Sequence, residues 1–254
     1  MTERAPILIR SLAYGWMIWL ILPLFLIISE FIFKFPAARA VFEDPRFWSA
    51  FWISLISALA VVVISAIFAV PAAYFLAYRF RNAHLLETLM IDIPQTLPPI
   101  AVGVIYLFIF GPGSPINLAF TFAAVIIAKL VVSSPFALAY TLRRFQEIKS
   151  SKLDLIARSL GADTNDVLFR VLIPLSKRDI ATGLTLCWSR AMGEFGGSLI
   201  FAGVIAYKTE ILPTYTNRVS SGDPALALAA TAVMAAFALI ALVTVKSLAL
   251  KKER

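Results

Sequence analysis

Six long apolar runs make up most of this sequence and limit the folds open to it. Each has roughly the 20 residues that an α-helix needs to cross the hydrocarbon core of a bilayer. Because no backbone polar group can be left unpaired in hydrocarbon, runs of this length predict helices. We therefore expect an all-α membrane protein, a single transmembrane domain over residues 1–254 with six transmembrane helices. The runs lie at Leu12 to Phe33, Phe51 to Ala77, Ile91 to Phe110, Phe120 to Tyr140, Ala181 to Ile205 and Ala225 to Val245.

The composition favours a membrane location for this basic chain over nucleic-acid binding. The sequence is 60% hydrophobic and 15% charged, with a net charge of +8. Its basic residues lie at the ends of apolar runs rather than on one soluble face, so we expect no nucleic-acid partner. The single cysteine, Cys187, lies inside an apolar run and offers neither a disulfide framework nor a metal cluster. These features predict a multi-pass protein of the cell membrane, surrounded by the lipid bilayer.

Lysine and arginine in the loops predict the orientation, because loops rich in them stay in the cytoplasm. With the N-terminus inside, two of the 23 basic residues, Lys129 and Arg190, fall within the membrane. Five more fall outside and the remaining 16 fall in the cytoplasm, which predicts that both termini are cytoplasmic. The five outer residues are Lys34, Arg39, Arg46, Lys208 and Arg218.

A long polar segment separates the fourth and fifth runs, and we interpret residues 142–180 as a cytoplasmic loop. Its central part predicts two short helices, the first at about Leu153 to Leu160. Gly161 is expected to hinge them, because glycine accepts the positive φ that often follows a helix C-terminus. The second helix should begin after Asp163 or Thr164, either of which can cap it, and cannot run regularly through Pro174.

The order of residues in this loop resembles the EAA loop of ATP-binding-cassette (ABC) importer permeases, which docks into a groove on the ATPase subunit. The likeness is carried by Ala157, Gly161, Ala162, Phe169, Val171, Pro174 and Leu175. Two positions depart from the pattern: its opening glutamate is Leu155 here, and Arg178 replaces a frequent proline. An ordinary cytoplasmic helix pair is the alternative. The resemblance implies ATPase-coupling residues at Asp154, Leu155, Ile156, Ala157, Arg158, Leu160, Gly161 and Ala162.

The third run opens with prolines that rule out a regular first turn, in IDIPQTLPPIAVG from Ile91 to Gly103. Irregular backbone is stable at membrane depth only where protein covers it or water reaches it. The stretch resembles the D-x-P-x3-P-P-x3-G signature of permeases of the molybdate, tungstate and sulfate branch. Thr96, Pro98 and Pro99 are therefore candidates for lining a pathway, and a kinked helix that only packs is the alternative.

Charged side chains within the fourth and fifth runs are the other pathway candidates. Lys129 lies near the middle of the fourth run, where inserting an amine costs about 2.5 to 3.5 kcal/mol, so it should face a partner or a wet cavity. Arg190 and Glu194 are four positions apart, so they share a helix face and can neutralise each other. Either set can instead be structural. The RAMGEFG run again resembles molybdate and sulfate permeases, and the remaining candidates are Ser133, Gly196, Gly197 and Ser198.

The sequence holds no catalytic constellation, no metal-spaced cluster and no phosphate-cradling glycine loop. We expect a chain that is not an enzyme and binds no cofactor or metal itself. The resemblance, over about residues 51–201, implies a permease for a tetrahedral oxyanion, molybdate or tungstate first and sulfate or thiosulfate as the alternative. It also implies a homodimer, two ABC ATPase subunits that hold MgATP on the cytoplasmic side, and an extracytoplasmic solute-binding protein. A secondary transporter and a membrane-embedded enzyme are less favoured, because the cytoplasmic loop argues against both.

Overall fold

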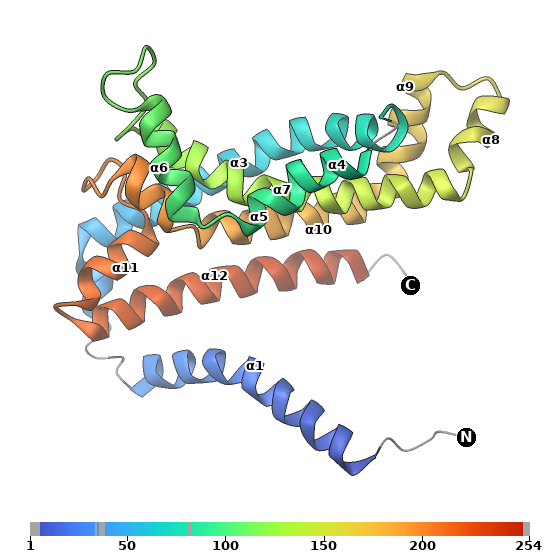
Figure 1. Ribbon diagram of the computed structural model, residues 1–254. Helices are drawn as coiled ribbons and strands as arrows, with labels where there is room; N and C mark the ends of the chain where they lie inside the picture. Colours follow the sequence, from blue (N-terminus) through green and yellow to red (C-terminus); the bar gives the residue numbers. More distant parts are fainter. Residues whose placement is uncertain (1–5, 34, 36–38, 81–82, 251–254) are drawn as a thin grey trace.

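The computed structural model describes residues 6–33, 35, 39–80 and 83–250, and within these ranges the chain is helical and has no strand. Figure 1 shows long helices running side by side, with α8 and α9 at one end and α11 at the other. Among the described residues, three helices are long and apolar enough to cross a membrane: α1 (Ile7–Phe33), α3 (Pro45–Tyr78) and α7 (Phe122–Ser150). A bent helix pair makes a fourth if its two arms form one span.

The centre of the bundle is formed by α3, α7 and α10 (Ile173–Met192), each packed against the other two. Small residues make this close packing possible, because without a large side chain the helix backbones can approach each other. A side chain on Gly183 would meet Tyr140 and the backbone of α7. Alanines such as Ala58, Ala73 and Ala137 are fully or almost fully buried in the same cluster.

The third predicted span is sharply bent rather than merely irregular. One arm consists of α4 (Ala83–Glu87), the π-helical turn η2 (Thr88–Asp92) and α5 (Ile93–Thr96), and the other is α6 (Pro99–Phe110). The arms meet at 106°. Leu97 and Pro98 each precede a proline, which disfavours helical backbone, and their ψ angles are 132° and 125°.

The fifth predicted span, Ala181 to Ile205, is wrong as a continuous helix. Helix α10 ends at Met192, and the chain becomes helical again only near the π-helical turn η4 (Ser198–Ala202). The break covers residues 193–195 and begins at Gly193, which ends α10 and weakens a helix by about 1 kcal/mol relative to alanine. The chain then forms α11 (Leu212–Ser220) and α12 (Pro224–Leu250).

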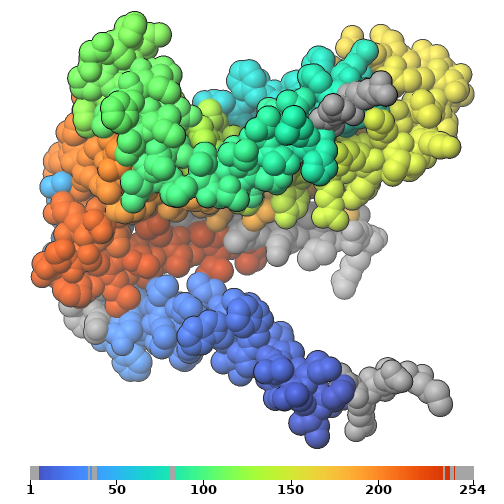
Figure 2. Space-filling view, viewed as in Figure 1, coloured from blue at the N-terminus to red at the C-terminus, as the bar shows by residue number. Residues whose placement is uncertain are grey.

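Helix α1 lies apart from the central bundle. None of its residues is buried, and it packs beside α12 (Figures 1 and 2). The beginning of α1 and the end of α12 lie at the same end of the molecule as α8 (Figure 1). The cytoplasmic location of that end and the count of six spans stay predictions, and Lys34, one of the five basic residues assigned to the outside, lies outside the described residues.

Candidate functional site

The polar segment between α7 and α10 turns at Gly161, as predicted, but only the helix before the turn is short, because the helix after it continues without interruption into α10. The first, α8, covers Leu153–Ser159, and Gly161 follows it with φ +92°. The second, α9, covers Thr164–Asp166 and is capped by Asp163, whose side chain accepts from the Asp166 backbone N–H at 2.7 Å. No atom lies within 4 Å of a Cβ built on Gly161, so only backbone conformation requires glycine there.

Both flanking helices extend into residues 142–180, and the assignment of that stretch to the cytoplasm stays a prediction. Helix α7 remains helical to Ser150, and α10 already begins at Ile173. Pro174 is accommodated because the chain widens into a π-helical turn, η3 (Val167–Leu172), directly before it. A proline has no N–H and clashes with the carbonyl four residues back, and a wider turn avoids both problems.

The surface of this segment is apolar although it lies at the end of the bundle. Leu155 and Ile156 are 53% and 55% exposed, and Leu160 is 85% exposed. Arg158 is exposed beside them, and Ala157 and Ala162 are half-buried. Exposed apolar side chains that gather in one place indicate an interaction surface. We call Leu155, Ile156, Leu160 and Phe169 the docking face. Asp154, in contrast, is 4% exposed and points into the chain.

The two interrupted segments of the membrane region meet each other directly. A Cβ on Gly196 would lie 2.9 Å from Ile100 Cγ1, and one on Gly197 would lie 3.2 Å from the Pro99 carbonyl oxygen. A Cβ on Gly103 would lie 2.8 Å from the Gly197 carbonyl oxygen. The bend before α6 packs directly against the chain that follows the end of α10. Only residues without a side chain, such as these glycines, allow the two backbones to come this close. We call this contact the crossing.

At the crossing, the bend before α6 is exposed in the single chain, whereas the residues after α10 that it packs against are buried. Thr96 and Pro98 are exposed at the bend, whereas Gly196, Gly197 and Ser198 are buried behind it. The Ser198 side chain is fully buried. Of the predicted pathway residues near the bend, Thr96 and Pro98 thus face outward, and Pro99 is half-buried.

Glu194 holds the break after α10 in place. Its fully buried carboxylate accepts hydrogen bonds from the backbone N–H groups of Gly197, at 2.8 Å, and Ser198, at 3.1 Å, and from the Ser198 hydroxyl. The predicted ion pair with Arg190 is not formed in the described part of the chain. Since α10 ends at Met192, the two residues no longer share a helical face. Glu194 acts as a cap, and Arg190 is half-buried.

Lys129 faces a partner inside the chain rather than a wet cavity. Its side chain is fully buried, and its Nζ donates to the Ser57 Oγ at 2.8 Å and to the Ser54 carbonyl oxygen at 3.3 Å. The Ser54 hydroxyl in turn accepts from the Leu212 N–H, which joins the start of α11 to α3. Sequence reasoning missed both serines, although polar residues recurring on one face of an apolar run are a usable signal. Ser133 is buried, and its hydroxyl has no hydrogen-bond partner among the described residues.

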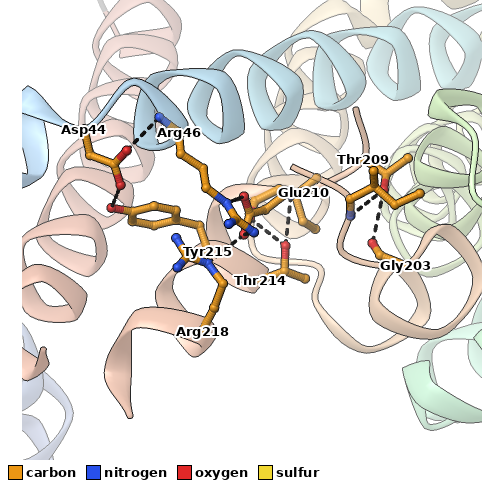
Figure 3. Close-up of polar contacts among 10 residues, drawn as sticks. Asp44, Arg46, Gly203, Thr209, Glu210, Thr214, Tyr215 and Arg218 are labelled. Atoms are coloured by element: carbon orange, nitrogen blue, oxygen red, sulfur yellow. Dashed lines mark hydrogen bonds and ion pairs between the residues drawn. The ribbon is translucent and has the colours of Figure 1, made fainter. Parts of the chain in front are cut away.

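A second group of charges (Figure 3), which sequence reasoning also missed, lies around α11, at the end of the bundle opposite α8 (Figure 1). Glu210 is 1% exposed and accepts hydrogen bonds from Arg46, through Nε and through Nη2 at 3.0 Å, and from Arg218 Nε at 3.1 Å. Tyr215 donates its hydroxyl to Asp44 at 2.7 Å. Arg46 and Glu210 are 164 positions apart, so no local pattern could have paired them. We call these five residues the outer cluster, after the side of the membrane that the loop charges predict for them.

Comparison with known proteins places the chain among transporter components. Residues 69–253 match the family described as "Binding-protein-dependent transport system inner membrane component". The chain is 33% identical over 213 residues to the "Molybdenum transport system permease protein ModB" of Mycobacterium bovis, covering 76% of this chain and 80% of that protein. It is 31% identical over 186 residues to the "Molybdate/tungstate transport system permease protein WtpB" of Pyrococcus abyssi, with 73% of each covered.

Two further likenesses extend over almost the whole chain. The "Sulfate transport system permease protein CysW" of Synechocystis is 27% identical over 255 residues, covering 95% of this chain and 92% of that one. A bacterial alginate ABC transporter, solved with an alginate-bound periplasmic protein, shares the fold with a TM-score of 0.73 and 15% identity over 94% of this chain and 92% of that chain. The chain is a multi-pass membrane protein that belongs to the family of binding-protein-dependent transport system inner membrane components.

Proposed function

We propose that this chain is the membrane-spanning permease subunit of an ATP-driven importer for a tetrahedral oxyanion, molybdate or tungstate. The observation that carries this proposal is the docking face, an apolar surface presented outside the bundle by a segment with the EAA-loop pattern. The names of the relatives supply the substrate class, since the molybdenum and molybdate/tungstate permeases are 31–33% identical to this chain over 73–76% of its length.

The docking face is suited to transmit movement from a partner on the cytoplasmic side. Helix α8 is linked to α7 through Lys152, which has a φ of +60°, and to α9 through the Gly161 hinge. If a partner displaces Leu160, we therefore expect α7 and α10 to move with it, because these two helices flank the segment. The partner in this proposal is an ABC ATPase subunit that binds MgATP, so that hydrolysis takes place outside this chain.

The crossing is the proposed gate. The bend exposes Thr96 and Pro98, and its close packing on Gly196 and Gly197 leaves little room for a side chain at either glycine. Lys129 and Glu194 lie behind it with their polar atoms satisfied, so they hold the frame and are not free to trap the solute. With Arg190 they give one net positive charge in the membrane per chain, which offsets part of the desolvation cost of an anion without a tight site.

The proposal includes a homodimer of permease subunits and an extracytoplasmic solute-binding protein. Two copies, each contributing one exposed bend, would enclose the pathway between them. The family description itself names dependence on a binding protein. In the alginate transporter, the solved complex contains a periplasmic protein.

Sulfate or thiosulfate is the second candidate substrate, and a specific observation favours it. The sulfate permease of Synechocystis covers 95% of this chain, more than either molybdate relative, although its identity is only 27%. The oxyanions share a tetrahedral shape, so the binding protein that delivers them is the expected source of selectivity.

Uptake by the reconstituted complex tests the proposal. Proteoliposomes containing this chain and its ATPase would be supplied with internal ATP, external binding protein and labelled molybdate, with unlabelled tungstate or sulfate as competitor. We expect uptake that requires both ATP and binding protein and is competed by tungstate more strongly than by sulfate. The reverse order of competition would assign sulfate, and uptake without the ATPase subunits would contradict the importer function.

A further inference from the structure

A cleft with both charged and apolar residues in its lining lies where the ends of α3 and α7 meet the beginning of α8, beside Leu155 of the docking face. It has a volume of about 620 Å³, within the range of small-molecule sites. Its polar lining includes Lys149, Lys152 and Asp154, and its apolar lining includes Leu76, Phe80 and Leu155. Asp154 was expected at the ATPase contact, but it is buried, and the docking face includes none of these three charged side chains.

The cleft contains a buried carboxylate, that of Asp154, with an oxygen that lacks a hydrogen-bond partner among the described residues. The residue is 4% exposed, and the oxygen without a partner is Oδ1. A carboxylate removed from water is stabilised only if a donor or a cation reaches it. Neither lysine of the lining forms an ion pair with it in the described part of the chain. Lys149 instead donates to the Ala77 carbonyl oxygen and lies 5.3 Å from the centre of the Tyr78 ring.

The charges of Lys149, Lys152 and Asp154 together disfavour both a simple anion and a simple cation as the ligand of the cleft. A free phosphate or other dianion would be attracted by the two lysines but repelled by the buried carboxylate of Asp154. A simple cation would suffer the opposite conflict. A group that carries a phosphate and an ammonium a few bonds apart satisfies all three residues, because the phosphate can accept from Lys149 and Lys152 while the ammonium donates to Asp154.

The depth of the cleft indicates where such a group comes from. Helix α3 has 34 residues, which at 1.5 Å per residue gives a length of about 50 Å. A bilayer with its headgroups is about 40–45 Å thick, so the last turn of α3, where Leu76 and Ala77 lie, reaches the headgroup layer. Leu76, on the bilayer side of the cleft, then offers an apolar surface to the beginning of an acyl chain, whereas Phe80 and Leu155 line the headgroup side.

We propose that the cleft between α3, α7 and α8 binds the headgroup of an aminophospholipid, phosphatidylethanolamine in character, with its phosphate at Lys149 and Lys152 and its ammonium at Asp154. The lipid would brace the coupling segment against the bundle from the membrane side. This inference concerns a lipid and not the transported solute, so it does not depend on which oxyanion is carried.

Native mass spectrometry of the purified complex of this chain with its ATPase tests the proposal. The complex would be equilibrated with equal amounts of phosphatidylethanolamine, phosphatidylglycerol and phosphatidylcholine before measurement. We expect several-fold preferential retention of phosphatidylethanolamine. Asp154→Asn, which keeps the shape and removes the charge, should reduce that lipid to the level of the other two. Lys152→Gln should lower retention of all three, and Arg143→Gln, at an exposed position outside the cleft, should change nothing.

Three results would overturn the assignment. The first is equal retention of the three lipids by the unaltered complex, and the second is an unchanged preference in Asp154→Asn. The third is preferential retention by the permease alone but not by the complex, which would show that a side chain of the ATPase fills the cleft. Displacement of the lipid by soluble glycerophosphoethanolamine would assign the site to a soluble phosphate ester and would also contradict the lipid proposal.

Discussion

The two ends of the molecule handle charge and apolar surface in opposite ways. At the α8 end, leucine and isoleucine side chains are exposed, and the capping interactions are local, as between Asp163 and Asp166. At the α11 end, a glutamate is buried, and its partner Arg46 is 164 positions away. The α8 end therefore offers an apolar surface that a partner can cover. At the α11 end, the charged side chains are already paired with each other by contacts between residues far apart in the sequence.

We therefore distinguish two roles. The docking face is a coupling element, which responds to a partner, and the outer cluster is a clamp, which holds helices together. The outer cluster joins the beginning of α3 to α11, so it should determine stability. The side chains of the docking face are exposed, so substitutions there should affect the response to the partner and leave the fold intact. Substitutions at each end, and at the crossing between them, test that division.

The largest expected effect is on stability at the outer cluster. Glu210→Gln removes the charge that holds Arg46 and Arg218, whose side chains are 28% and 39% exposed. Leaving a charge partly buried and unpaired should lower the free energy of unfolding by about 3 kcal/mol. Denaturant unfolding in detergent would measure it, with Glu43→Gln as control because that glutamate is 70% exposed. Equal stability of the two variants would show that the outer cluster is not a clamp.

The next effect is on coupling at the other end. Gly161→Val forces a β-branched residue to φ +92°, a strain of about 1–3 kcal/mol. Gly113→Val imposes the same strain at φ +94°, and neither glycine has an atom within 4 Å of a built Cβ. We expect Gly161→Val alone to lose roughly tenfold or more of the ATPase stimulation by loaded binding protein. Equal losses in both variants would remove the special role of the hinge.

What the sequence could predict follows the same division. Gly161, Asp163 and the irregular backbone before Pro174 were identified because helix caps and prolines act on residues a few positions away. The break after α10 was missed since Arg190 and Glu194 have ideal helical spacing. The glycines that interrupt it are stabilised by packing on Pro99 and Ile100, about 100 positions earlier in the chain, and no local pattern shows that contact.

Lys129 gives the same lesson in the membrane interior. Its depth in an apolar run correctly indicated a polar partner, but the identity of that partner depends on how α3 packs against α7. The outer cluster was missed for the same reason. Orientation rules treated Arg46 and Arg218 as separate charges, while the fold brings them to one carboxylate.

A smaller effect is expected at the crossing, between the two ends. In a Cys187→Ala background, Thr96→Cys should react with a small aqueous thiol reagent, with a rate that changes about tenfold when ATP is added, because Thr96 is exposed at the bend. Ser198→Cys should stay unreactive, since Ser198 is fully buried. Reaction of both cysteines at one rate would show that the crossing is not arranged as a gate.

The smallest effect is expected for Tyr215→Phe. Burial and the hydrogen bond to Asp44 raise the pKa of Tyr215, so it stays protonated and donates. Losing one hydrogen bond to a charged acceptor should cost about 1–2 kcal/mol, less than Glu210→Gln, and should leave ATPase stimulation unchanged. A loss of stimulation without a loss of stability would place coupling at the outer end, against the division between clamp and coupling element.

Protection of Leu160 by the ATPase tests the central claim most directly. In a Cys187→Ala background, Leu160→Cys would be labelled with a thiol reagent in the permease alone and in the complex with ATPase subunits. Because Leu160 is 85% exposed, we expect rapid labelling of the permease alone. In the complex, we expect labelling to be slower by at least roughly tenfold, a ratio of rates that corresponds to about 1.4 kcal/mol. Gly222→Cys, exposed at the opposite end of the bundle, should label equally in both. Equal labelling of Leu160→Cys with and without the ATPase subunits would show that the docking face does not bind them.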